Sequence, residues 1–165
     1  MSELTQNFDV VVIGGGAAGL NGALMLARAR RSVAVIDSGR PRNAPAEGVH
    51  GFVTRDGVPP AELVRIGQDE VRGYGGTIVA GEVRTVRKVD DGFAVVLDHG
   101  TEYGARRILV TSGLIDELPE IDGLAERFGR DVLHCPYCHG WEVRDQPIGI
   151  VATSAFAAHQ ALMFR

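Results

Sequence analysis

Residues 8–20 read FDVVVIGGGAAGL, and this stretch decides the fold of the chain. Residues 8–13 are mostly β-branched and end at a glycine, which predicts a buried strand of a parallel sheet. The pattern Gly-x-Gly-x-x-Gly follows at once, and an Ala- and Leu-rich segment over residues 20–30 predicts a helix. Residues 32–36 predict a second strand, and Asp37 closes it. This order of strand, glycine turn, helix, strand and acid is typical of a dinucleotide-binding unit.

Each glycine of the turn has its own expected role. Gly14 permits the tight turn, Gly16 lets the backbone approach a pyrophosphate without a Cβ, and Gly19 lets the helix pack against the strand. The pyrophosphate would lie on the first N–H groups of the helix, and Asp37 is placed for the ribose hydroxyls. A glycine-rich turn that binds no ligand is the alternative.

Residues 38–60 are rich in glycine and proline and predict a long loop that leaves the ribose-binding acid. Loops of this length in compact domains are usually functional or disordered. The candidate cofactor-binding residues on this loop are Ser38, Arg42, Asn43 and His50. For each of them, an ordinary solvated position is the alternative.

The segment after the loop predicts the rest of one domain. Residues 60–74 have the apolar spacing of a helix, and residues 77–80 predict a strand. Apolar residues then recur at every second position over residues 83–97, which is typical of a β-meander. Residues 107–110 return to a buried strand, followed by Thr111, Ser112 and Gly113. These small residues would bring the backbone close to a cofactor, with a plain turn as the alternative.

A second domain is predicted to begin near residue 118. Residues 114–132 predict a crossover, residues 148–151 a strand, and residues 154–164 a helix. One strand and one helix cannot bury a core of their own. The predicted fold class is α/β, with a three-layer Rossmann-like domain and β-meander over residues 1–117. The first βα unit of a second dinucleotide-binding domain follows over residues 118–165.

Composition narrows the function classes. Of the 165 residues, 45% are hydrophobic and 23% charged, as in ordinary globular proteins. The net charge is −4 with no long basic run, so nucleic-acid binding is not indicated. Residues 1–8 lack the features of a signal peptide, and no apolar window approaches a membrane span. We therefore expect a cytoplasmic protein without a membrane association.

Residues 134–141, HCPYCHGW, contain both cysteines of the chain. The C-x-x-C spacing suits a redox couple, because one helical turn brings the two sulfurs within bonding range. One thiolate would attack a substrate disulfide and the other would resolve it. Because imidazoles titrate near neutral pH, His139 would stabilise a thiolate or carry a proton to a leaving thiol.

Three alternatives to the redox pair stay open. A zinc site could use Cys135, Cys138, His134 and His139, although structural zinc sites usually combine two separated ligand pairs. Residues 135–139 also match the C-x-x-C-H haem-attachment pattern, which normally follows export. Two inert buried cysteines are the third alternative. The redox pair is favoured, and no metal site is predicted.

Four stretches together resemble the low-molecular-weight thioredoxin reductase family of flavoproteins. They are residues 11–20 (VVIGGGAAGL), Asp37, residues 111–113 (TSG) and residues 135–140 (CPYCHG). The resemblance runs through the whole chain and covers about the first half of a family member. In that family an FAD domain is interrupted by an NADPH domain, and the C-x-x-C lies at the start of the insert.

The resemblance implies a set of site residues. The FAD pyrophosphate would meet Gly14, Gly16, Ala17, Ala18 and Gly19. The ribose would meet Asp37, the adenine would lie near Val83, and residues 111–113 would lie near the dinucleotide. Cys138 would face the flavin, and Cys135 would be the interchange thiol. Dimers are common in this family, so a homodimer is among the implied partners.

The chain also departs from the family pattern. Thioredoxin reductases usually carry Asp where His139 stands, and CPYCHG looks more like the branch of dithiol oxidases that pass electrons to oxygen. In addition, small residues replace the expected NADPH-binding glycines, which weakens the prediction of NADPH binding. These replacements are Ala152, Ser154 and Ala157.

We therefore expect part of an FAD-dependent disulfide oxidoreductase that resembles thioredoxin reductase. Electrons would pass between the flavin and the Cys135–Cys138 pair, and from there to or from a thioredoxin-like protein or a small-molecule dithiol or disulfide. The alternatives are an oxygen-dependent dithiol oxidase that works without NADPH and an inactive nucleotide-binding remnant.

Overall fold

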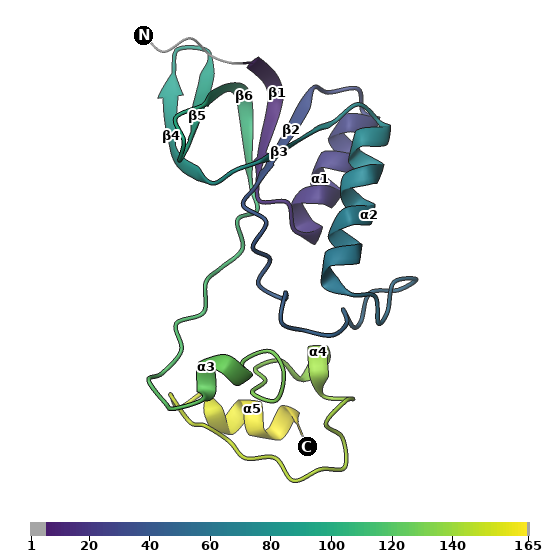
Figure 1. Cartoon of the computed structure of the whole chain (residues 1–165), viewed down its shortest axis with the longest axis vertical. Coiled ribbons are helices and arrows are strands. Elements are labelled where there is room, and N and C mark those ends of the chain that lie inside the picture. The colour runs from purple at the N-terminus through teal and green to yellow at the C-terminus, as the bar shows by residue number, and fades with distance from the viewer. Residues whose placement is uncertain (1–5, 165) are drawn as a thin grey trace. The chain divides into compact units, whose positions relative to one another are not determined.

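The computed structural model describes residues 6–164, which fall into two compact units (Figure 1). The first unit consists of two stretches, the residues up to Arg42 and Ala61–Leu114. The second unit consists of Asn43–Pro60 and the residues from Ile115 onward. Residues 1–8 are expected not to form a signal peptide. Of these, residues 1–5 lie outside the described residues. The domain division near residue 118 stays a prediction.

The first unit is built on one six-stranded sheet with the strand order β3-β2-β1-β6-β5-β4. The strands are β1 (Gln6–Ile13), β2 (Val33–Asp37), β3 (Thr77–Ala80), β4 (Val83–Val89), β5 (Gly92–Leu97) and β6 (Glu102–Val110). The pairs β1–β2, β1–β6 and β2–β3 are parallel, whereas β4–β5 and β5–β6 are antiparallel. Two helices, α1 (Ala17–Arg28) and α2 (Pro60–Gly73), lie side by side against the parallel strands (Figure 1).

Alternation along β1 divides the core into two layers. Val10 and Val12 pack in a cluster with Leu20 and Ala23 of α1. Val11 points the other way, into a cluster that includes Val95 and Leu97 of β5, because successive side chains of a strand lie on opposite faces. The order of layers is therefore helices, parallel strands and meander. This confirms the predicted three-layer Rossmann-like fold.

Two predicted boundaries differ from the structure. The strand predicted over residues 107–110 begins earlier, at Glu102, because β6 serves both the meander and the parallel strands, and its Ala105 pairs with Phe93 of β5 and with Phe8 of β1. Helix α1 begins at Ala17 rather than at residue 20, since Gly16 is its N-cap and its carbonyl accepts the N–H of Leu20. Alanines are strong helix formers, so they extend the helix to the glycine turn.

The second unit contains three short helices, α3 (Leu124–Arg127), α4 (Pro136–His139) and α5 (Ala157–Met163). The strand predicted over residues 148–151 is wrong, because this segment forms no strand and Ile150 is exposed. A strand needs a neighbour for its backbone hydrogen bonds, and the described part of this unit offers none beside it. None of the described helices is both long and apolar enough to cross a membrane.

Replacing Leu97 by Ala should test the layer between the parallel strands and the meander. The side chain of Leu97 is 1% exposed, so its loss leaves a cavity that should lower the free energy of unfolding by about 2–5 kcal/mol. Denaturant unfolding followed by circular dichroism measures this change. The control is Leu162→Ala, because Leu162 is 68% exposed and should change stability by less than about 0.5 kcal/mol. Equal effects of the two substitutions would contradict the assigned core.

Candidate functional site

The turn after β1 leaves no room for a side chain at its first glycine. Gly14 has a φ of 101°, which favours glycine, and its N–H donates a 2.9 Å hydrogen bond to the carbonyl of Ile36. A Cβ at Gly14 would lie 2.3 Å from the carbonyl oxygen of Thr111. Both the backbone angle and this contact therefore require glycine.

The other two glycines of the motif differ sharply in their surroundings. A Cβ at Gly19 would lie 1.9 Å from the carbonyl oxygen of Gly14, so Gly19 allows α1 to pack on the end of β1. A Cβ at Gly16 would meet nothing within 4 Å. The Gly16 position is thus open, at the N-terminus of a twelve-residue helix whose first turn holds no acidic residue. Such a helix N-terminus attracts anions, because its first N–H groups are unpaired.

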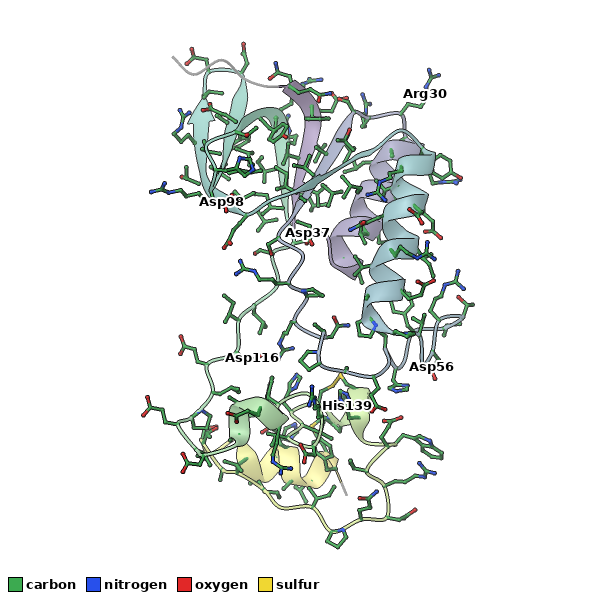
Figure 2. All side chains as sticks on the ribbon, in the orientation of Figure 1. Arg30, Asp37, Asp56, Asp98, Asp116 and His139 are labelled. Atoms are coloured by element: carbon green, nitrogen blue, oxygen red, sulfur yellow. A yellow bond between two sulfur atoms is a disulfide. The ribbon has the colours of Figure 1, made fainter. Side chains whose placement is uncertain are left out.

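Asp37, the last residue of β2, is held beside the glycine turn (Figure 2). Its Oδ2 accepts a 2.5 Å hydrogen bond from the N–H of Gly15, and its Oδ1 accepts one of 2.8 Å from the N–H of Gly39. Each carboxylate oxygen has a second lone pair for a further donor. The acid predicted to meet a ribose is therefore oriented by the backbone.

Thr111, directly after β6, forms hydrogen bonds with the same glycine turn. Its N–H donates to the carbonyl of Ile13 at 2.9 Å. Its hydroxyl lies 3.0 Å from that carbonyl oxygen and 2.9 Å from the carbonyl oxygen of Gly14, so it can donate to either. Ser112 and Gly113 follow in exposed positions. The structure thus brings the Thr-Ser-Gly segment to the glycine turn, and the contact of this segment with a cofactor stays a prediction.

The remaining cofactor-binding candidates divide between the two units. Ser38 follows Asp37 in an exposed position, and Val83 begins β4 and pairs with Leu97. Arg42 belongs to the first unit, whereas Asn43 and His50 belong to the second unit. Their cofactor contacts stay predictions. Alanines Ala17 and Ala18 lie exposed in the first turn of α1.

One ion pair beside this region was missed from the sequence. The guanidinium of Arg40 donates to the carboxylate of Glu82 at 2.5 Å. Nearby, the N–H of Gly81 donates to the carbonyl of Asp37, so the turn between β3 and β4 is joined to the end of β2. No local pattern signals this pair, because its members are far apart in the sequence.

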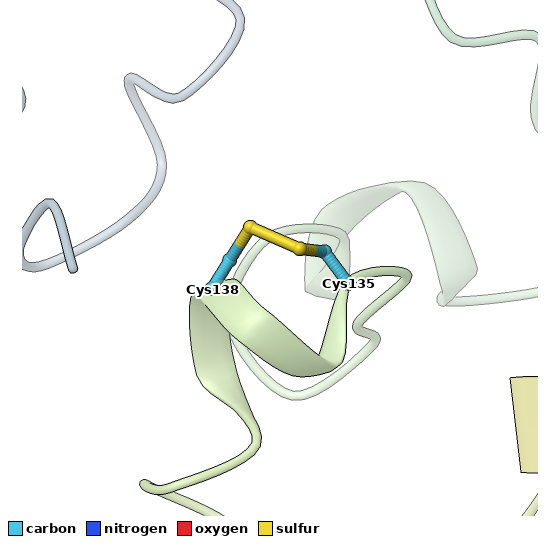
Figure 3. The surroundings of a disulfide bond; sticks show 2 residues. All are labelled: Cys135 and Cys138. Carbon is cyan, nitrogen blue, oxygen red and sulfur yellow. A yellow bond between two sulfur atoms is a disulfide. The ribbon is translucent and has the colours of Figure 1, made fainter. Parts of the chain in front are cut away.

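In the second unit, Cys135 and Cys138 form a disulfide at the start of α4 (Figure 3). Their Cα atoms are 5.3 Å apart, within the usual range for a disulfide. Cys135 is the N-cap residue of α4, and its carbonyl accepts hydrogen bonds from the N–H groups of Cys138 and His139. The helical turn expected from the C-x-x-C spacing is therefore formed.

His139 closes α4 directly after the second cysteine (Figure 2). Its Nδ1 is buried and has no hydrogen-bond partner among the described residues. Buried polar atoms in proteins are nearly always paired, so this unpaired ring nitrogen is unusual, and the proton-transfer role of His139 stays a prediction. His134, by contrast, stacks on the ring of Phe128.

The zinc alternative gains no support from this arrangement. The two cysteines are bonded to each other rather than free to act as thiolate ligands. Within residues 6–164, no group of three or more His, Cys, Asp or Glu side chains is arranged to hold a metal ion.

Comparison with known proteins gives a consistent result. A family model for pyridine nucleotide-disulphide oxidoreductases matches residues 8–162. The thioredoxin reductase sirT of Leptosphaeria maculans is 38% identical over 148 residues, which cover 87% of this chain and 45% of that protein.

Two solved structures are also similar. The structure of HlmI has a TM-score of 0.89 and 52% identity, and the match covers 96% of this chain and 51% of that one. The oxidoreductase from Agrobacterium tumefaciens has a TM-score of 0.91 and 42% identity, covering 96% and 54%. The chain thus spans about half the length of the relatives it matches.

A pair of glycine substitutions should separate binding from folding in this turn. Gly16→Ala adds a Cβ to open space at a φ of −73°, so the stability of the protein should hardly change. The added methyl group would obstruct the approach of a pyrophosphate, and we expect FAD affinity to fall by about tenfold or more. Flavin absorbance after FAD loading and gel filtration measures the binding.

Gly19→Ala is the matched comparison. Its Cβ would overlap the backbone of Gly14, so it should lower the free energy of unfolding by more than about 2 kcal/mol. A Gly16→Ala protein that retains FAD as tightly as the unmodified protein would contradict a pyrophosphate site at this position.

Proposed function

Because the chain belongs to the pyridine nucleotide-disulphide oxidoreductase family, we propose that its cysteine pair exchanges electrons between a bound flavin and a substrate disulfide. The chain resembles the N-terminal portion of thioredoxin reductases and spans about half of their length. For this reason the activity is proposed for the whole protein. One observation carries the proposal. A disulfide lies at the N-terminus of a helix, in a chain whose other unit has a Rossmann-like fold.

The first unit supplies residues that fit the adenosine and pyrophosphate parts of FAD. The open position at Gly16 and the free N–H groups of α1 would receive the pyrophosphate. The oriented carboxylate of Asp37 would accept hydrogen bonds from the ribose hydroxyls. Bound FAD would supply a two-electron carrier that can reduce a disulfide or be reduced by a dithiol.

In the reductive direction, the cysteines would act in two exchange steps. The thiolate of Cys135 attacks one sulfur of the substrate disulfide, forms a mixed disulfide and releases one substrate thiol. The thiolate of Cys138 then attacks the sulfur of Cys135 and releases the second substrate thiol. The substrate gains two electrons, and the protein is left with the Cys135–Cys138 disulfide seen in the structure.

His139 is the proposed proton carrier of these steps. It follows Cys138 directly, and its Nδ1 has no hydrogen-bond partner among the described residues. A neutral imidazole nitrogen can take the proton of a cysteine thiol, and an imidazolium can return a proton to a leaving thiolate. The substrate in this direction is the disulfide of a thioredoxin-like protein or of a small molecule.

The assignment of the two cysteines can be tested by trapping. In the reduced Cys138→Ser variant, Cys135 should form a mixed disulfide with bis(2-hydroxyethyl) disulfide that persists, because the resolving thiol is missing. Intact mass spectrometry detects the adduct. The reduced Cys135→Ser variant is the control and should form far less of it. Equal adduct formation in both variants would show that the roles are not distinct.

A second direction, oxidation of a small dithiol by oxygen, is favoured by the segment after the disulfide. Ala152, Ser154 and Ala157 stand where the glycines of an NADPH-binding turn are expected, and their side chains would hinder the tight turn and the close approach of a pyrophosphate. In this direction two substrate thiols exchange with the Cys135–Cys138 disulfide and leave as a disulfide. Bound FAD would supply the route by which the two electrons, with the two protons of the substrate thiols, reach dioxygen and form hydrogen peroxide.

Flavin reduction by different donors distinguishes the two directions. For the oxidase, a dithiol added to FAD-loaded protein should consume oxygen and produce peroxide, whereas NADPH should leave the flavin absorbance unchanged. Cys135→Ser should abolish the peroxide because it removes the exchange. Rapid bleaching by NADPH would instead support the reductase. A protein that cannot be loaded with FAD would favour the third alternative, a nucleotide-binding remnant.

A further inference from the structure

His50 lies where two segments that are far apart in the sequence meet. It belongs to the loop that follows β2, and an antiparallel bridge between Val49 and Val58 closes this loop. The N–H of Gly51, the next residue, donates a 2.8 Å hydrogen bond to Oδ1 of Asp56. The backbone on both sides of His50 is therefore held in place by contacts within the loop.

Two carboxylates face the imidazole of His50, one at each ring nitrogen. Nδ1 lies 3.7 Å from Oδ2 of Asp56 in the same loop, and Nε2 lies 3.5 Å from Oε1 of Glu142. Glu142 comes just after α4, the helix at whose start the disulfide lies. His50 thus connects the loop after β2 to the disulfide-bearing segment, and all of these residues belong to one compact unit.

Only the protonated ring fits both carboxylates. A neutral imidazole has one N–H, and its other nitrogen carries a lone pair that would face a carboxylate oxygen. An imidazolium has two N–H groups, so it attracts both carboxylates at once. The two contacts therefore stabilise the junction below the pH range in which imidazoles titrate. This contribution is lost as the pH rises through that range.

The other groups around His50 do not offset the two acids. The described residues that line the pocket at this junction are His50, Gly51, Asp56, Tyr137, Trp141 and Glu142, and none of them is a lysine or an arginine. The phenol of Tyr137 is the remaining titratable group of this lining, and phenols are uncharged near neutral pH. The guanidinium of Arg144 lies 4.1 Å from the centre of the Trp141 ring and donates to the carbonyl of that residue. The side chain of His50 is 28% exposed, so solvent screens its ion pairs only in part.

From this arrangement we propose that His50 is a pH-sensitive latch between the loop after β2 and the segment that follows α4. Below neutral pH the imidazolium holds Glu142 to the loop. Above neutral pH the ring no longer attracts both carboxylates, and the two segments move independently. Thiols form thiolates as the pH rises, so the latch opens over the range in which thiol exchange at the neighbouring disulfide becomes faster. The latch does not depend on the proposed function, because its contacts lie within the chain itself.

A double-mutant cycle of His50→Gln and Glu142→Gln tests the latch in the oxidised chain. Hydrogen exchange followed by mass spectrometry gives the protection of the loop amides over residues 51–58, corrected for the intrinsic exchange rate at each pH. At about pH 5.5, His50→Gln should lower this protection by about threefold, and Glu142→Gln alone should lower it less. Adding Glu142→Gln to His50→Gln should change nothing further, because the pair is already broken. At about pH 8 the three variants should match the unmodified chain.

His159→Gln is the matched control, because His159 is an exposed histidine of the same unit whose ring contacts Phe156. It should leave the loop protection, and the effect of Glu142→Gln on it, unchanged at both pH values. Circular dichroism checks that each variant keeps the helix content of the unmodified chain. The latch is overturned if the effects of His50→Gln and Glu142→Gln add at the acidic pH, or if His50→Gln has no effect there. It is also overturned if His50→Gln lowers the protection equally at both pH values, since the role of His50 would then be structural and independent of its charge.

Discussion

The close approach of backbone segments at the carboxyl end of β1 is the constraint on which the first unit depends. A Cβ at Gly14 would overlap the carbonyl oxygen of Thr111, and a Cβ at Gly19 would overlap the carbonyl oxygen of Gly14. These contacts let α1 start directly after the strand and keep its first N–H groups open at Gly16. The open helix N-terminus at this point is therefore a consequence of how the strand and helix pack, and it is the feature on which the proposed dinucleotide site rests.

The second unit is stabilised differently. Among the described residues, its buried hydrophobic side chains are Leu124 and Ala157, whereas the first unit buries two clusters around β1. Its local structure depends on the disulfide, on backbone hydrogen bonds and on the bridge between Val49 and Val58. Regions with few buried apolar contacts open more easily than a packed core, so local opening among the described residues should be concentrated in this unit.

Sequence reasoning succeeded where periodicity and glycine spacing are local. The roles of Gly14 and Gly19, the meander and the helical turn of the C-x-x-C are of this kind. It failed at β6, because one strand serves two neighbours, and over residues 148–151, because apolar residues alone do not supply a strand partner. It also could not anticipate that His50 would lie between Asp56 and Glu142.

The sequence by itself determined the strand–turn–helix–strand unit and the helical turn of the C-x-x-C, since each depends on residues within a short window, and four separate stretches together indicated the family. Only the tertiary structure decided that Thr111 braces the glycine turn, that Nδ1 of His139 is left unpaired, and that the loop after β2 joins Tyr137 and Trp141 in a pocket. These features join residues far apart in the chain. Their contacts arise from packing, which no local pattern encodes.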